Sequence, residues 1–238
     1  MLDFKYIFSG LAMIFQPGLK RYVFIPLILS SLILAGFLWI AYFQFDIFMN
    51  WLLPADSWLH WLSWLLWPLF AITFLLIVFY GFTIIANLVA APFNSRLAEA
   101  VAAKLDENYN TLNESSLMRD IGKSISAEVR KLMYYLVRAI PLLILMLFPL
   151  TSPVASVLWL LLTIWFLALE YLAYPMENQL LRFDEQKKQL RKKPLSSLSF
   201  GGGVMLLMFI PFINLAAMPA AVAGATIYWH QKIKEPLK

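Results

Sequence analysis

The sequence predicts an all-α integral membrane protein with two long transmembrane helices, two re-entrant (hemi-penetrating) helical hairpins and amphipathic cytoplasmic helices. Three observations predict this fold class: long runs without Asp, Glu, Lys or Arg, the position of the Lys and Arg residues between those runs, and proline-containing breaks inside two of them. Hydrophobic residues make up 61% of the 238-residue chain and charged residues 14%, whereas soluble domains have about 45–50% and about 25%. The four uncharged runs are Tyr22–Gln44, Ser57–Ser95, Ala139–Leu169 and Pro194–Gln231.

The first two runs are long enough to cross a bilayer. About 20 helical residues span the hydrocarbon core, so an uncharged apolar run of about 18 residues or more indicates a membrane segment. We expect one transmembrane helix at residues 22–44. We expect a second at residues 61–93, which extends into the cytoplasm to about residue 108. The whole chain, residues 1–238, then forms a single membrane domain.

The Lys and Arg residues predict which segments are cytoplasmic. Short cytoplasmic loops of membrane proteins collect these residues. Three lie in Met1–Arg21, seven in Arg96–Arg138 and six in Glu170–Lys193, whereas Phe45–Asp56 has none. We therefore expect both termini and both basic loops in the cytoplasm, with only the region around residues 45–58 outside.

The third and fourth runs are expected to enter and leave the membrane on the same side. The run at residues 139–169 has only 31 residues, whereas two full crossings need about 40. It is interrupted at Phe148–Pro153, and the fourth run is interrupted at Ile210–Asn214; proline breaks a helix interior. We expect re-entrant hairpins at 139–169 and 198–230, with arms of about 12–15 residues. The alternative is a pair of proline-kinked full spans, which would place many Lys and Arg residues on the wrong side.

A re-entrant tip exposes backbone groups at membrane depth, and these survive only inside protein or beside a water-filled cavity. Two such tips favour a transport pathway or an oligomer core over a simple anchor. The chain has no cysteine, and its two histidines, His60 and His230, are far apart. We therefore expect no metal, no cofactor, no catalytic residues and no enzymatic activity. The net charge of +5 is explained by membrane orientation, so no nucleic-acid partner is expected.

The segment just before the first transmembrane helix is a candidate anion-binding site. It reads Gln16-Pro17-Gly18-Leu19-Lys20-Arg21. A helix N-terminus presents unpaired N–H groups and a partial positive charge. Lys20 and Arg21 add two cations, and a guanidinium binds an oxyanion through two parallel hydrogen bonds. The alternative is two ordinary positive-inside anchors that reach lipid phosphates.

Several stretches of the chain resemble one known family, the CysZ-type sulfate transport proteins of the bacterial inner membrane. The resemblance extends from about Tyr6 to about Trp229, nearly the whole chain. The matching stretches keep the same order along the sequence. They are Gln16–Pro26 (QPGLKRYVFIP), Trp58–Pro68 (WLHWLSWLLWP), Ile85–Asn94 (IANLVAAPFN), Tyr174–Asn178 (YPMEN) and Ile210–Gly224 (IPFINLAAMPAAVAG).

The resemblance implies sulfate uptake across the inner membrane for sulfate assimilation and cysteine biosynthesis, by a channel or permease. It also implies a homo-oligomer of two or more chains, embedded in the lipid bilayer, and a fold with two long spanning helices and two hemi-penetrating hairpins. In the family, sulfate binds at a Gly-Leu-basic-Arg stretch, which corresponds here to Gly18, Leu19, Lys20 and Arg21. Lys20 departs from the pattern because Arg is common at that position, and Lys lacks the planar fork of Arg.

Two other functions stay open from the sequence alone. A non-transporting membrane scaffold or assembly factor would lack buried polar groups that converge on a water-accessible path. A membrane enzyme acting on lipid would need a clustered acid/base or nucleophile set, and the sequence shows none. Among the remaining polar residues, we expect Glu170 and Glu177 to form structural ion pairs with basic residues of the cytoplasmic helices. We expect Gly201–Gly203 to allow close helix packing or a bend.

Overall fold

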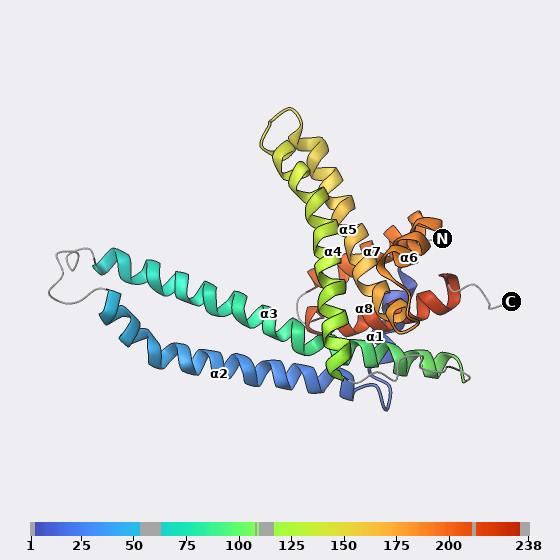
Figure 1. The fold of residues 1–238 in the computed structure, drawn as a ribbon, viewed down its shortest axis with the longest axis horizontal. Coiled ribbons are helices and arrows are strands. Elements are labelled where there is room, and N and C mark those ends of the chain that lie inside the picture. Colours follow the sequence, from blue (N-terminus) through green and yellow to red (C-terminus); the bar gives the residue numbers. More distant parts are fainter. Residues whose placement is uncertain (1–2, 53–62, 108, 110–116, 211–212, 234–238) are drawn as a thin grey trace. The chain divides into compact units, whose positions relative to one another are not determined.

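The computed structural model describes residues 3–52, 63–107, 109, 117–210 and 213–233, and every regular element in these ranges is helical. The chain divides into two compact units, Met1–Val23 with Asn94–Lys238, and Phe24–Phe93. The elements are α1 (Lys5–Ile14), α2 (Arg21–Leu52), α3 (Ser63–Leu105), α4 (Leu117–Met146), α5 (Ser152–Glu177), α6 (Phe183–Lys192), α7 (Pro194–Phe209), α8 (Asn214–Tyr228) and the π-helix η2 (Trp229–Ile233) (Figure 1).

The unit Phe24–Phe93 is an antiparallel pair formed by most of α2 and the first part of α3 (Figure 1). The ring centroids of Phe48 and Phe74 lie 6.0 Å apart and join the two helices. Most of the described apolar side chains of the pair are exposed, which a soluble protein rarely tolerates over so large an area. The hydroxyls of Ser31 and Thr73 donate to carbonyls four residues earlier, at 2.8 Å. Their polar atoms are therefore satisfied inside the helix, as a lipid environment requires.

Among the described residues, three helical stretches are long and apolar enough to cross a membrane: Arg21–Gln44, Trp64–Phe82 and Ser152–Glu177. The first two overlap the runs expected to form transmembrane helices, residues 22–44 and 61–93. α3 continues as one helix to Leu105, so its last three turns belong to the other unit. The third stretch is α5, the second arm of an expected hairpin. By length and composition α5 could cross completely, so its re-entrance stays a prediction.

In the unit Met1–Val23 with Asn94–Lys238, α4 and α5 form an antiparallel hairpin whose turn lies at the proline-containing break (Figure 1). The expected arm length of about 12–15 residues is wrong here, because α4 has 30 residues and α5 has 26. The reason is that each helix continues through a proline, Pro141 in α4 and Pro175 in α5, so that its apolar arm is joined to a more polar segment. The amphipathic stretch Met118–Arg138 is therefore part of α4 and not a separate helix.

The tip of this hairpin satisfies much of its own backbone. The Thr151 hydroxyl donates to the Leu145 carbonyl at 2.6 Å, and the Ser152 N–H donates to the Phe148 carbonyl at 2.9 Å. The side chains of Leu147 and Leu150 are 79% and 92% exposed. The tip is thus apolar outside and hydrogen-bonded inside, so it needs fewer partners at membrane depth than the sequence suggested.

The second break separates α7 and α8, which have 16 and 15 residues and are close to the expected arm length. Pro211 and Phe212, in the break itself, lie outside the described residues. α8 packs against α1 at very close range: a Cβ on Gly10 would lie 2.2 Å from the Ala220 carbonyl oxygen. A Cβ on Gly201 would lie 2.0 Å from the Ile164 carbonyl oxygen in α5, which confirms the close-packing role expected for the glycine triplet.

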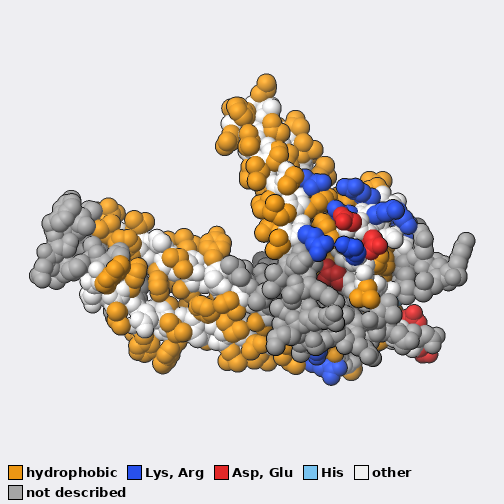
Figure 2. All heavy atoms as spheres, viewed as in Figure 1, with side chains coloured by type: hydrophobic (Ala, Val, Ile, Leu, Met, Phe, Trp, Pro, Cys, Tyr) orange, Lys and Arg blue, Asp and Glu red, His pale blue; other side chains and the backbone are white. Residues whose placement is uncertain are grey.

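Polar ties outside the apolar segments hold this unit together. The Asp3 N–H donates to Ser199, and the Asp3 carboxylate lies 3.0 Å from the Lys232 ammonium. Lys131 of α4 lies 3.3 Å from Glu177 of α5, which confirms the expected ion pair for Glu177. In the view of Figure 2, apolar side chains cover the outer part of the α4–α5 hairpin, and Lys and Arg side chains gather over its base and α6.

Candidate anion-binding site

The candidate site is the turn between α1 and α2. The Gln16 N–H donates to the Met13 carbonyl at 3.0 Å and ends α1, and the Leu19 N–H donates back to the Gln16 carbonyl at 3.2 Å. Gly18 has φ +87°, in the left-handed region that favours glycine. A Cβ at Gly18 would meet no atom within 4 Å, so the glycine is required by backbone conformation and leaves an open approach to the chain.

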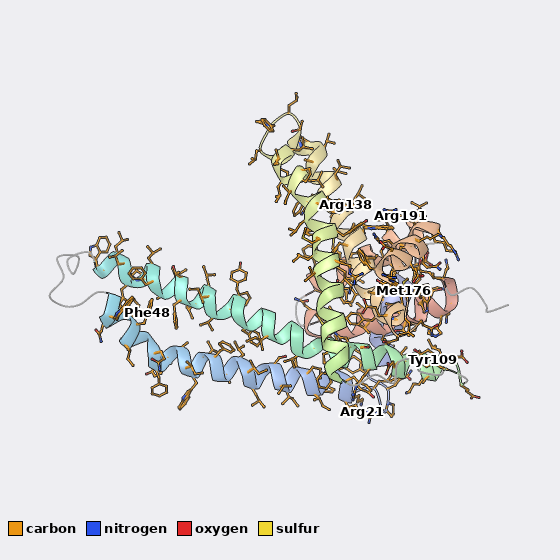
Figure 3. All side chains as sticks on the ribbon, viewed as in Figure 1. Arg21, Phe48, Tyr109, Arg138, Met176 and Arg191 are labelled. Atoms are coloured by element: carbon orange, nitrogen blue, oxygen red, sulfur yellow. The ribbon has the colours of Figure 1, made fainter. Side chains whose placement is uncertain are left out.

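The four residues named by the sequence divide into one anchor and three exposed groups. The Leu19 side chain is 1% exposed and belongs to a core cluster with Leu97 and Val101 of α3. Its N–H already donates within the turn, so Leu19 holds the turn in place instead of offering a donor. Gly18, Lys20 and Arg21 are exposed, and Figure 3 shows Arg21 at the start of α2.

Three N–H groups of the turn remain available. Within the described residues, the N–H groups of Gly18, Lys20 and Arg21 make no backbone hydrogen bond. The next two N–H groups, of Tyr22 and Val23, donate to carbonyls three residues earlier. Because α2 begins at Arg21, the free groups lie at its positive end, where an anion is stabilised.

Three cations belong to the turn or contact it. Arg21 lies over the neighbouring Tyr22 ring at 4.8 Å, and its Nη2 donates to the Tyr22 hydroxyl at 2.9 Å. Lys104, in the last turn of α3, donates to the Pro17 carbonyl at 3.0 Å and to Gln16 Oε1 at 3.3 Å. Among the described residues, no carboxylate pairs with Lys20, Arg21 or Lys104. The turn therefore carries a local positive charge that a divalent anion would neutralise.

The sequence did not reveal the role of Lys104. It is 87 positions from Pro17 in the chain, and the charge pattern identified it only as one of seven cytoplasmic cations. The stacking of Arg21 on Tyr22 joins adjacent residues, so the dipeptide itself was a usable signal. Elsewhere in the described part of the chain, no group of three His, Asp or Glu residues is arranged to hold a metal ion.

Comparison with known proteins identifies the family to which this chain belongs. A family model described as "Sulfate transporter CysZ/Etoposide-induced protein 2.4" matches residues 6–219. The chain is 40% identical to the sulfate transporter CysZ of Pseudomonas fluorescens (strain Pf0-1), over 94% of this chain and 91% of that protein. It is 39% identical to its counterpart in Pseudomonas aeruginosa (strain LESB58), over 94% and 93%.

A similar relation holds outside that genus. The sulfate transporter CysZ of Pectobacterium atrosepticum is 40% identical over 94% of this chain and 82% of its own length. The range that the family model matches, residues 6–219, includes Gln16–Arg21, both long apolar helices and the α4–α5 hairpin. This chain belongs to the sulfate transporter CysZ/etoposide-induced protein 2.4 family.

Proposed function

We propose that this protein transports sulfate across the bacterial inner membrane and binds it at the turn Gly18–Arg21. The observation that carries the proposal is an open helix N-terminus with three cations and, among the described residues, no carboxylate paired with them. The proposal is further supported by about 40% identity, over nearly the whole chain, to proteins named sulfate transporters.

The chemistry of the turn suits sulfate. The dianion has only acceptor oxygens, and the N–H groups of Gly18, Lys20 and Arg21 are donors without a backbone partner in the described structure. The Arg21 guanidinium has five N–H bonds, of which one is used on Tyr22. Arg21 therefore supplies charge-assisted hydrogen bonds, while Lys20 supplies a mobile point charge.

In this proposal, more than one chain forms the transport path. Both termini lie in the cytoplasm, and the hairpins α4–α5 and α7–α8 penetrate the membrane only part of the way. A homo-oligomer of two or more chains then completes the path for the anion. Sulfate that enters the cell is assimilated into cysteine. No covalent step on the anion is part of this function, and no cofactor is required.

The test is radiolabelled sulfate flux into liposomes that contain only this protein. We expect uptake above that of empty liposomes, and reduced uptake by an Arg21→Ala protein that inserts equally well. Flux equal to that of empty liposomes would support the alternative of a membrane scaffold or assembly factor.

A further inference from the structure

Lys104 uses its charge in an unusual way. Its ammonium is not paired with a carboxylate among the described residues; it donates to the carbonyl oxygen of Pro17 and to the amide oxygen of Gln16. Both acceptors lie in the turn that precedes α2. Because two acceptors bind the one ammonium, its position relative to the Pro17 carbonyl is fixed in direction as well as in distance.

The peptide bond between Pro17 and Gly18 transmits this direction. It is trans, since the described chain has no cis peptide bond. In a planar trans peptide the C=O and N–H bonds point in opposite directions. A hydrogen bond that holds the Pro17 oxygen toward Lys104 therefore turns the Gly18 N–H to the opposite side. The N–H of Gly18 is one of the three N–H groups of the turn without a backbone acceptor in the described structure.

Besides that hydrogen bond, the turn hydrogen bond from the Leu19 N–H to the Gln16 carbonyl restrains this peptide plane. Gly18 is exposed, and a Cβ added there would have no atom within 4 Å. Glycine also has the widest backbone freedom of all residues. A cation on the carbonyl oxygen also polarises the peptide and makes its N–H a stronger donor, as in any chain of hydrogen bonds. Orientation and polarisation both favour an anion on the Gly18 side.

We infer that Lys104 is a positioning residue of the sulfate site: it directs and polarises the Gly18 N–H through the Pro17 carbonyl. The inference rests on the proposed function, and it deepens it by joining the end of α3 to the anion-binding turn. Lys104 lies on the far side of the peptide from the anion and does not touch it. Its removal should weaken sulfate binding and leave the Arg21 contribution in place.

The sequence offers a direct spectroscopic test, because Pro17-Gly18 is the only Pro-Gly pair in the chain. Protein labelled with carbonyl-¹³C proline and ¹⁵N glycine gives a single carbonyl–amide correlation in a triple-resonance experiment. Its ¹³C shift reports the hydrogen bond from Lys104 to the Pro17 carbonyl, and its ¹H and ¹⁵N shifts report the anion at Gly18. The probe is sodium sulfate, titrated at constant ionic strength into full-length protein in nanodiscs.

We expect sulfate to shift the Gly18 amide resonance of the natural protein. Lys104→Met should move the Pro17 carbonyl resonance and lower sulfate affinity about 3- to 10-fold, because one hydrogen bond to the anion is weakened and not removed. Lys104→Arg should restore both, since guanidinium also donates to a carbonyl. Lys188→Met, at an exposed position of α6, is the matched control and should change neither.

The outcomes separate this inference from the site itself. If Arg21→Ala weakens binding while Lys104→Met changes neither the carbonyl resonance nor the affinity, the positioning role is wrong and the site stands. If sulfate leaves the Gly18 resonance unmoved and Arg21→Ala binds normally, the site fails and the inference with it. Should Lys104→Met not fold, Lys104→Gln provides the same comparison, with a neutral donor expected to bind more weakly than Lys104→Arg.

Discussion

The Lys131 ammonium lies 3.3 Å from Oε1 of Glu177 and joins α4 to the last turn of α5. The two side chains differ in exposure, 2% for Lys131 and 33% for Glu177. Part of the Glu177 side chain therefore still meets water, although its Oε1 atom is buried, whereas the ammonium depends on protein groups. The pair lies at the base of the α4–α5 hairpin, next to Asn178. The Ser95 hydroxyl of α3 donates a hydrogen bond to Asn178 Oδ1 at 2.8 Å.

This difference in exposure predicts unequal effects of removing each partner. Glu177→Gln removes the negative charge that lies beside the buried Lys131 ammonium and should cost about 3–5 kcal/mol of stability. Lys131→Met keeps the aliphatic volume and leaves a carboxylate on a side chain that is 33% exposed, so its cost should be about 1 kcal/mol. Thermal unfolding in detergent measures both, and the double variant should resemble Lys131→Met. Equal losses would show that both charges depend on the pair to the same extent.

The close contact of α1 with α8 predicts that Gly10 does not tolerate alanine. The added Cβ would lie 2.2 Å from the Ala220 carbonyl oxygen and 2.4 Å from the Gly224 nitrogen, both backbone atoms that move only with their helix. Gly10→Ala should cost about 1–3 kcal/mol. Gly36→Ala, where a Cβ meets no atom within 4 Å, is the matched control and should be neutral or stabilising by up to about 1 kcal/mol. Melting temperatures in one detergent compare the two variants.

The N-terminal tie through Asp3 predicts a loss of stability in acid. Burial raises the pKa of the Asp3 carboxyl, but hydrogen bonds from Ser196 and Lys232 outweigh it, and the pKa is lower than its ordinary value. A carboxyl with a lowered pKa stabilises the fold above its unfolded pKa of about 3.9, and this contribution is lost as the pH falls through the folded pKa. Asp3→Asn should be less stable near neutral pH and should lose less on acidification. Melting temperatures from about pH 7 to about pH 3 test this. Identical pH profiles for the natural protein and Asp3→Asn would show that the Asp3 carboxylate does not stabilise the fold.

The distribution of Lys and Arg predicts which face of the membrane each loop occupies. The chain has no cysteine, so single substitutions provide clean labels. Lys188→Cys, in the basic helix α6, should react with an impermeant thiol reagent only from the cytoplasmic side, and Asn50→Cys only from the periplasmic side. The reverse labelling pattern would show that the topology is inverted. Periplasmic labelling at both positions would show that the expected hairpin crosses the membrane completely.

The site predicts a graded series at Arg21. Arg21→Ala removes charge-assisted hydrogen bonds worth roughly 1.5–3 kcal/mol, which corresponds to a loss of sulfate affinity of about 10- to 150-fold. Arg21→Lys should be intermediate because the charge stays while the fork is lost. Arg191→Ala, exposed on α6, is the control. Binding of radiolabelled sulfate to purified protein at fixed ionic strength gives the affinities. Unchanged affinity in a folded Arg21→Ala protein would leave Lys20 and Arg21 as membrane anchors.

Local sequence patterns predicted most of the helical organisation. The uncharged runs at 22–44 and within 57–95 became the apolar parts of α2 and α3. The proline-containing break at 148–153 became the turn between α4 and α5, and the break at 210–214 lies between the main parts of α7 and α8. These features are readable because hydropathy and proline act on neighbouring residues. The arm lengths of the first hairpin could not be predicted in this way, because α4 joins a polar segment to an apolar one and continues through Pro141, where a break would be expected.

The sequence by itself therefore determined that the chain is a helical membrane protein, where its helices turn and which four residues bear the anion-site pattern. Only the tertiary structure decided that Leu19 is buried as an anchor, that Lys104 binds the Pro17 carbonyl and that Asp3 meets Lys232. These contacts join residues far apart in the chain, and they depend on the register at which helices pack. That register is determined by close backbone approaches such as Gly10 on Ala220, which no local pattern of hydropathy or charge encodes.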